Sequence, residues 1–162
     1  EDYAQECYAL VKQLRLDNLI FTGRVDVVQY MQKLDFTILT SISEGQPLSV
    51  LESMAARRPC VTTEVGCCRE LLEGAPGDDL GVAGYCVPPM YRQGLTDAME
   101  KLCASRALRE KLGAVGQKRV AQDYRCEQML EQYRALYAET AQAHGLPDQT
   151  DSEELWLELG SN

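Results

Sequence analysis

The pattern of apolar and polar positions predicts helices that alternate with short strands. Its clearest unit begins with the apolar run 36–39, which is typical of a buried parallel strand. A polar loop, 40–46, follows, and apolar side chains then recur at helical spacing after Pro47, a residue suited to a first helical turn. Residues 60–63 form a second apolar run and predict the next strand. Ligands of such folds gather at the carboxyl ends of the strands, against the helix N-terminus.

The same alternation extends on both sides of this unit. We predict further strands at 18–22 and 85–87, and helices at 1–14, 26–33, 67–72, 91–104, 105–123 and 125–143. Asp26 is placed to cap the second helix, and Gly66 to form the turn ahead of the helix at 67–72. The order indicates an α/β fold, a doubly wound parallel sheet of Rossmann-like type with C-terminal helices. Because no strand precedes the first helix, we expect the sheet to be incomplete at its N-terminal edge.

Composition fits one domain with a substantial core: 162 residues, 45% of them hydrophobic. We assign residues 1–143 to this domain and 144–162 to a flexible acidic tail. The net charge of −9 is uneven, because without residues 139–162 the balance is 16 basic against 19 acidic residues. A nucleic-acid surface should be basic, so no nucleic-acid partner is expected.

Other compositional features exclude several classes of chemistry. His144 is the only histidine, which argues against Ser-His-Asp catalysis and against histidine-rich metal sites. Seven cysteines without a C-x-x-C pair are expected to be reduced thiols that mostly fill the core of a cytoplasmic protein. There is no signal peptide, no apolar run of membrane-spanning length, no P-loop and no G-x-G-x-x-G.

Two carboxylates are the candidate chemistry of the central unit. Glu44 lies in the loop past the strand end, and Glu52 lies in the helix that follows. Carboxylates accept hydrogen bonds from sugar hydroxyls, and the free N–H groups near Leu48 and Ser49 suit a phosphate. One site could therefore hold a nucleotide sugar. From the pattern alone, a loop carboxylate (Glu44) and a solvated helix residue (Glu52) are the favoured explanation, because Glu131 and Glu139 share the same spacing.

A resemblance to a known family favours the nucleotide-sugar site. The segment S-I-S-E-G-Q-P-L-S-V-L-E-S-M-A-A resembles the signature of family-4 retaining glycosyltransferases of the GT-B fold. The similarity includes F-T-G-R-V-D-V-V-Q-Y-M-Q-K-L-D, V-G-C-C-R-E-L-L and Y-C-V-P-P, and covers roughly residues 3–138. It is strongest to the bacterial exopolysaccharide transferases of the PelF type, in which T-S-I-S-E-x-Q-P-L also occurs. Where that family usually has glycine before the second strand of the unit, this chain has Arg57.

The resemblance implies a C-terminal, donor-binding half with a defined set of site residues. Glu44 would contact the donor hexose and stabilise charge in catalysis without acting as a general base, and Glu52 would bind the ribose hydroxyls. The remaining implied donor-binding residues are Gly45, Gln46, Leu48 and Ser49 at the hexose and diphosphate, Arg24 and Val25 at the base, and Gly66. The implied donor is UDP-glucose, with no cofactor and no metal.

The implied activity is hexose transfer, with retention of configuration, to a growing polysaccharide or another glycan acceptor. An N-terminal acceptor domain and a basic pair that neutralises the diphosphate would precede Glu1, so we expect the chain alone to be inactive. A cytoplasmic location is expected, with attachment to the inner face of the plasma membrane in a polysaccharide-synthesis complex as an option. A non-catalytic α/β binding module derived from such a transferase is the alternative. The roles of two neighbouring residues stay open. Glu70 could contact the sugar or cap its helix, and Arg69 could meet a phosphate or remain an exposed helix charge.

Overall fold

The computed structural model describes residues 2–145, which belong to two compact units, Glu1–Tyr30 and Met31–Asn162. The first unit contains helix α1 (Asp2–Leu14), as the apolar spacing predicted. The apolar side chains of this helix are largely exposed, at 78% for Tyr3 and 57% for Leu14. The Tyr8 and Phe21 rings meet edge to face with their centroids 4.5 Å apart.

The strand predicted at 18–22 is wrong. These residues have no regular structure, and Ile20 is 82% exposed. A strand is stable only where its backbone groups pair with a neighbour, and no described residue pairs with this segment. The following helix, α2 (Val27–Met31), is shorter than predicted, but its cap is confirmed because the Gln29 N–H donates to the Asp26 carboxylate at 3.2 Å.

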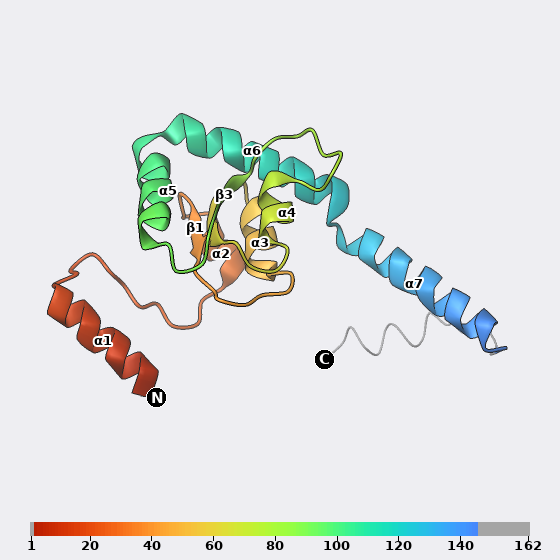
Figure 1. Cartoon of the computed structure of the whole chain (residues 1–162), viewed down its shortest axis with the longest axis horizontal. Helices are drawn as coiled ribbons and strands as arrows, with labels where there is room; N and C mark the ends of the chain where they lie inside the picture. The colour runs from red at the N-terminus through yellow and green to blue at the C-terminus, as the bar shows by residue number, and fades with distance from the viewer. Residues whose placement is uncertain (1, 146–162) are drawn as a thin grey trace. The chain divides into compact units, whose positions relative to one another are not determined.

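The second unit is built on a parallel three-stranded sheet (Figure 1). Its strands are β1 (Thr37–Leu39), β2 (Cys60–Thr63) and β3 (Gly84–Val87), in the order β1-β2-β3. In the register, Val61 lies between Ile38 and Tyr85. All four residues of β2 are buried, which explains the unbroken apolar run in the sequence.

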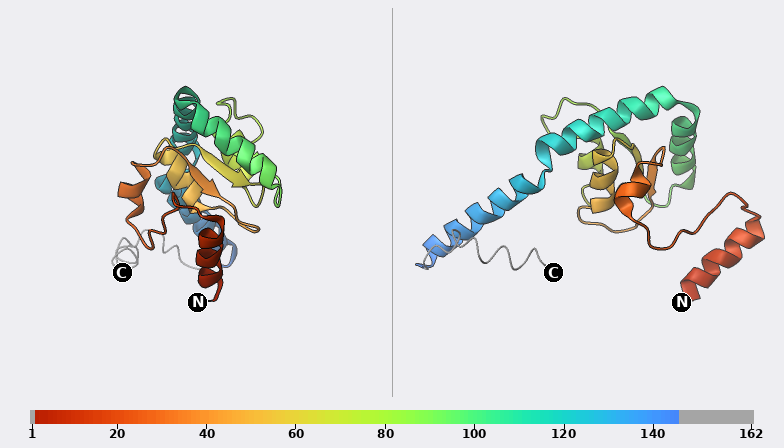
Figure 2. Two further views of the ribbon diagram at one scale, coloured as in Figure 1. Left: turned by 90° about the vertical axis from the view of Figure 1, so that its left-hand side faces the viewer. Right: turned by 180° about the vertical axis from the view of Figure 1, so that it is seen from behind.

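Helices cover both faces of this sheet, as the turned view shows for α3 and α5 (Figure 2). One core cluster joins Cys60 to α3 (Leu48–Ala55) and α4 (Cys68–Glu73) through Val50, Met54, Leu71 and Leu72. The other joins Val61 and Val87 to α5 (Arg92–Ala104) through Ala98 and Leu102. Helix α6 (Arg106–Asp123) contributes Leu112 to the second cluster and Val115 to the first. The doubly wound α/β fold is thus confirmed.

Most predicted helix limits agree with the structure within one or two residues. The last helix, α7 (Cys126–Ala143), follows the predicted 125–143, and Ser105 caps α6 by accepting from the Leu108 N–H at 3.2 Å. No helix in the described part of the chain combines the length and the apolar character that a membrane crossing requires. The predicted tail lies outside the described residues from position 146 on.

Candidate functional site

The loop that follows β1 is bound to the turn that follows β2. The Thr63 hydroxyl donates to the Ser41 carbonyl at 2.5 Å, and the Cys67 N–H donates to the Gly45 carbonyl at 3.0 Å. Gly66, between them, has a φ of 52°, and a methyl group there would overlap the carbonyl oxygens of Glu44 and Gly45. Only glycine satisfies both the backbone angle and this close approach, so Gly66 fixes the loop at the carboxyl ends of two neighbouring strands.

Helix α3 starts from this loop. The buried Pro47 is its N-cap residue, one position ahead of the first helical turn, with φ −73° and ψ 114°. The Val50 N–H donates to the Pro47 carbonyl at 3.2 Å, whereas the N–H groups of Leu48 and Ser49 have no acceptor within the helix. Their N–H groups, with the positive end of the helix dipole, form a place where an anion is stabilised.

The two carboxylates flank this helix start. Glu44 is half-buried in the loop, and Glu52 is exposed one turn into α3. Most predicted site residues lie on one segment, 44–52. The structure brings Gly66 against this segment. Arg24 and Val25 belong to the other compact unit. The role of each residue toward a donor stays a prediction.

Arg69 is held by neighbouring carboxylates. Its guanidinium pairs with Glu64 at 2.5 Å and with Glu73, one turn along α4, at 2.9 Å. The Arg69 hydrogen bond holds the pKa of the Glu64 carboxyl below its usual value. The interpretation as an exposed helix charge is therefore favoured over a phosphate contact. Glu70 accepts a long hydrogen bond, 3.5 Å, from the Tyr124 hydroxyl, which leaves both of its options open.

The cysteines near the site are packing residues. Cys68 is fully buried, and Cys67 packs against the core cluster of α3 and α4. Burial raises the pKa of Cys60 to about 11 and also raises the pKa of the Cys67, Cys68 and Cys86 thiols. These thiols are therefore protonated at neutral pH and are poor nucleophiles. Within residues 2–145, no group of three or more His, Cys, Asp or Glu side chains could hold a metal ion.

A buried arginine, which the sequence analysis missed, donates hydrogen bonds to backbone carbonyls of α4. Arg119 of α6 is 1% exposed and pairs with Asp78 at 2.6 Å. It also donates to the carbonyls of Leu71, Leu72 and Gly81 at 3.0, 3.1 and 2.5 Å. The Asp78 carboxylate balances the charge of Arg119, and the Arg119 hydrogen bond depresses the pKa of Asp78. The sequence does contain one indication that Arg119 is buried: it lies seven residues after Leu112, on the apolar stripe of α6.

Comparison with known proteins decides the family. The family model of the glycosyl transferases group 1 matches residues 2–105, well over half of the chain. The chain belongs to this family. The GT-B resemblance is thereby confirmed at the family level.

Individual relatives agree with this assignment. The chain is 29% identical over 130 residues to an N-acetyl-alpha-D-glucosaminyl L-malate synthase of Bacillus anthracis, covering 79% of this chain and 32% of that protein. It is also similar to a sucrose-phosphate synthase from Thermosynechococcus elongatus, with 26% identity and a TM-score of 0.71 over 83% of this chain and 34% of that one. This glycosyltransferase-family chain thus spans about a third of the length of these relatives.

Two further solved structures share the fold. One is the C-terminal domain of a glycosyl transferase group 1 family protein from Francisella tularensis, with 27% identity and a TM-score of 0.62 over 77% of this chain and 64% of that one. The other is the Anabaena protein Alr3699/HepE in complex with UDP-glucose, with 23% identity and a TM-score of 0.71 over 88% of this chain and 37% of that one.

Proposed function

We propose that this chain is the donor-binding portion of a retaining hexosyltransferase of the exopolysaccharide type, a family-4 enzyme. The donor is UDP-glucose, the acceptor is a growing polysaccharide or another glycan, and no metal or cofactor takes part. The observation that carries the proposal is the loop 40–47, fixed by Gly66 so that the half-buried Glu44 lies beside the N-terminus of α3. The UDP-glucose complex of the Anabaena protein, which has the same fold, supports the choice of donor.

Each part of the segment 44–52 suits one part of a nucleotide sugar. The Leu48 and Ser49 N–H groups would meet the diphosphate, because the helix start offers unpaired donors and a favourable dipole. Glu52, exposed one turn later, would accept hydrogen bonds from the two ribose hydroxyls. Glu44, with the Gly45 and Gln46 backbone, would hold the hexose.

The reaction proposed for the complete enzyme keeps the anomeric configuration. The bond between the anomeric carbon and the UDP oxygen breaks, and the acceptor oxygen bonds to the same face. The acceptor proton passes to the departing phosphate oxygen, so that no protein base is required. Glu44 would orient the hexose and stabilise the positive charge that develops at the anomeric carbon.

Calorimetric titration of UDP tests the assignment of the ribose residue. We expect UDP to bind the isolated chain with a Kd on the order of millimolar, about −4 kcal/mol. Glu52→Gln should weaken this binding by roughly 1–3 kcal/mol, because it removes a charged hydrogen-bond acceptor. Glu44→Gln should leave UDP binding unchanged, since its partner is the hexose.

Glu131→Gln is the matched control, since it removes one negative charge from an exposed position of α7. Loss of affinity in Glu52→Gln alone supports the proposal. Equal affinity in all three variants would remove Glu52 from the ribose role. Absence of any UDP binding to a folded chain would favour the non-catalytic interaction module.

A further inference from the structure

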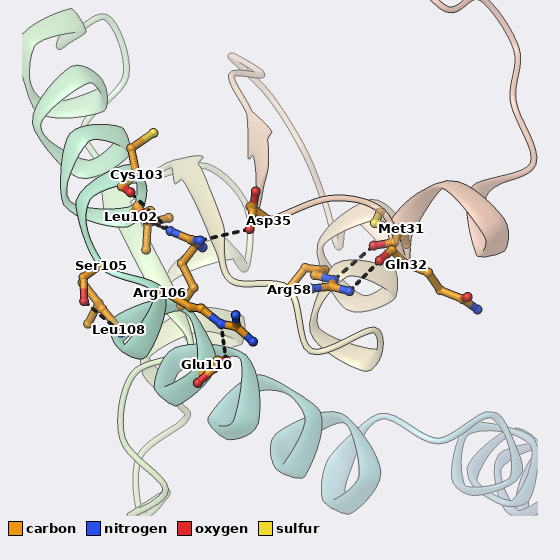
Figure 3. Close-up of polar contacts among 11 residues, drawn as sticks. Met31, Gln32, Asp35, Arg58, Leu102, Cys103, Ser105, Arg106, Leu108 and Glu110 are labelled. Carbon is orange, nitrogen blue, oxygen red and sulfur yellow. Dashed lines mark hydrogen bonds and ion pairs between the residues drawn. The ribbon is translucent and has the colours of Figure 1, made fainter.

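A cavity lies at the opposite end of the sheet from the candidate donor site. Its volume is about 240 Å³, and its lining is almost entirely charged: Asp35, Arg57, Arg58, Arg106, Arg109 and Glu110. Asp35 lies two residues before β1 and Arg58 two residues before β2, so these residues mark the amino ends of the strands. Arg106 and Glu110 come from the first turns of α6, whose N-terminus adds a positive dipole (Figure 3).

Two of the four arginines are neutralised within the cluster. Arg106 pairs with Glu110 at 2.8 Å, and Arg109 pairs with Asp35 at 3.0 Å. Arg58 donates to the carbonyls of Met31 and Gln32 at 3.1 and 2.7 Å, which fixes its direction but leaves its charge uncompensated (Figure 3).

Arg57 supplies the second uncompensated charge. Its guanidinium forms no hydrogen bond and no ion pair with any residue from 2 to 145. The cavity therefore holds two positive charges in excess. Like charges gathered around one concavity raise the local concentration of anions.

The backbone at Arg57 makes this arrangement unusual. Arg57 follows the C-cap Ala56 with a φ of 59°, in the left-handed region where glycine is the ordinary residue. The backbone here also packs against α6: Gly113 approaches the Arg57 carbonyl so closely that a methyl group at Gly113 would overlap it. A side chain kept at a strained angle, without a partner and facing a charged cavity, points to a use that glycine could not serve.

We propose that this cavity binds a phosphate monoester dianion, recognised by Arg57 and Arg58 with Arg106 and Arg109 behind them. The excess of two positive charges matches a dianion, and the planar guanidinium fork fits phosphate oxygens. The cavity is smaller than the roughly 300–1,000 Å³ of a site for a drug-sized ligand, so it takes a headgroup-sized anion. Because it is remote from the segment 44–52, this site is independent of the proposed donor site.

The test is an NMR titration of the full 162-residue chain with inorganic phosphate at constant ionic strength. Saturable shifts are expected at the Arg57 and Arg58 amides and at the Arg106 Nε–H. Arg57→Gln should raise the Kd about tenfold, the loss expected for one charge-assisted contact. Arg134→Gln, which removes a charge from an exposed position of α7, should leave the Kd unchanged.

Arg57→Gly separates a binding role from a structural one. It relieves the backbone strain, so the variant should melt at a higher temperature than the wild type and yet lose the response to phosphate. The cavity assignment is overturned if no saturable shift occurs, if Arg57→Gln and wild type respond equally, or if the shifts are confined to residues 45–49.

Two further arms identify the source of the phosphate. Displacement of inorganic phosphate by glycerol phosphate supports a soluble phosphorylated metabolite. Sedimentation with phosphatidic acid vesicles, lost in Arg57→Gln, supports a lipid headgroup of the same chemistry. Failure of both probes to compete with inorganic phosphate at the Arg57 amide would contradict recognition of a phosphate monoester.

Discussion

Replacement of Arg119 by methionine removes the most completely buried charge among the described residues of the sheet unit. The Arg119 side chain is 1% exposed, and it makes five hydrogen bonds: two to the Asp78 carboxylate and three to backbone carbonyls. Methionine keeps much of the volume of the side-chain stem but donates nothing. The carbonyls of Leu71, Leu72 and Gly81 then lose their charged donor, and Asp78 loses its counter-ion.

The expected loss is large relative to the stability of a domain. Removing one partner of a buried ion pair typically costs about 3–5 kcal/mol, because the remaining groups are buried without compensation. Domains are stable by only about 5–15 kcal/mol. For a unit of this size, the loss corresponds to a fall in melting temperature on the order of 10–20 °C.

Urea denaturation followed by circular dichroism measures this loss, with the m-value as a check that the folded state is unchanged. Arg106→Met is the matched control on the same helix: Arg106 pairs with Glu110 one turn away, and its side chain is 84% exposed. Its denaturation midpoint should stay close to that of the wild type. A loss below about 1 kcal/mol in Arg119→Met would refute the reasoning. It would mean that the buried network stabilises the fold little more than an apolar side chain does.

The remaining predictions concern backbone angles and acid stability. Arg57→Gly should raise the free energy of unfolding by about 0.5–1 kcal/mol, because φ is 59° there, and thermal melting measures the gain. Gly66→Ala should lower the stability by more than about 1 kcal/mol and abolish UDP binding, since the new methyl overlaps the Gly45 carbonyl; a calorimetric titration with an unchanged UDP affinity would contradict this. The pKa of Asp78 is depressed below its ordinary 3.8, so its contribution is complete above about pH 4 and is lost as the pH falls through the lower, folded-state value. Asp78→Asn should therefore have a lower urea midpoint than the wild type at pH 7. The two midpoints should converge in strong acid.

The sequence predicts this fold well where one local pattern decides the outcome. The strand 60–63 agrees with β2 in both limits, because a strand buried on both faces must be apolar throughout. The helices near 91–104 and 105–123 agree with α5 and α6 within a residue, since Ser105 both ends one helix and caps the next. Arg57, which stands where the resembling family usually has glycine, has a positive φ, as is common for the residue that follows a helix C-cap.

Features that depend on distant partners could not be predicted in the same way. The segment 18–22 has the apolar character of a strand, but strand formation needs a neighbouring backbone that local sequence does not reveal. Arg119 looks like any helix arginine until the loop that carries Asp78 folds over it. For the same reason, the contact of Gly66 with the Gly45 carbonyl was not foreseen, although the turn itself was.

The most direct test of the donor-binding proposal is a comparison of UDP and UDP-glucose by NMR chemical-shift mapping on the labelled chain. Both ligands should shift the amides of Leu48, Ser49 and Glu52, because both carry the ribose and the diphosphate. Only UDP-glucose should add shifts at Glu44 and Gly45, where the hexose is expected. Identical maps for the two ligands, or shifts that avoid the segment 44–52, would contradict the proposed site.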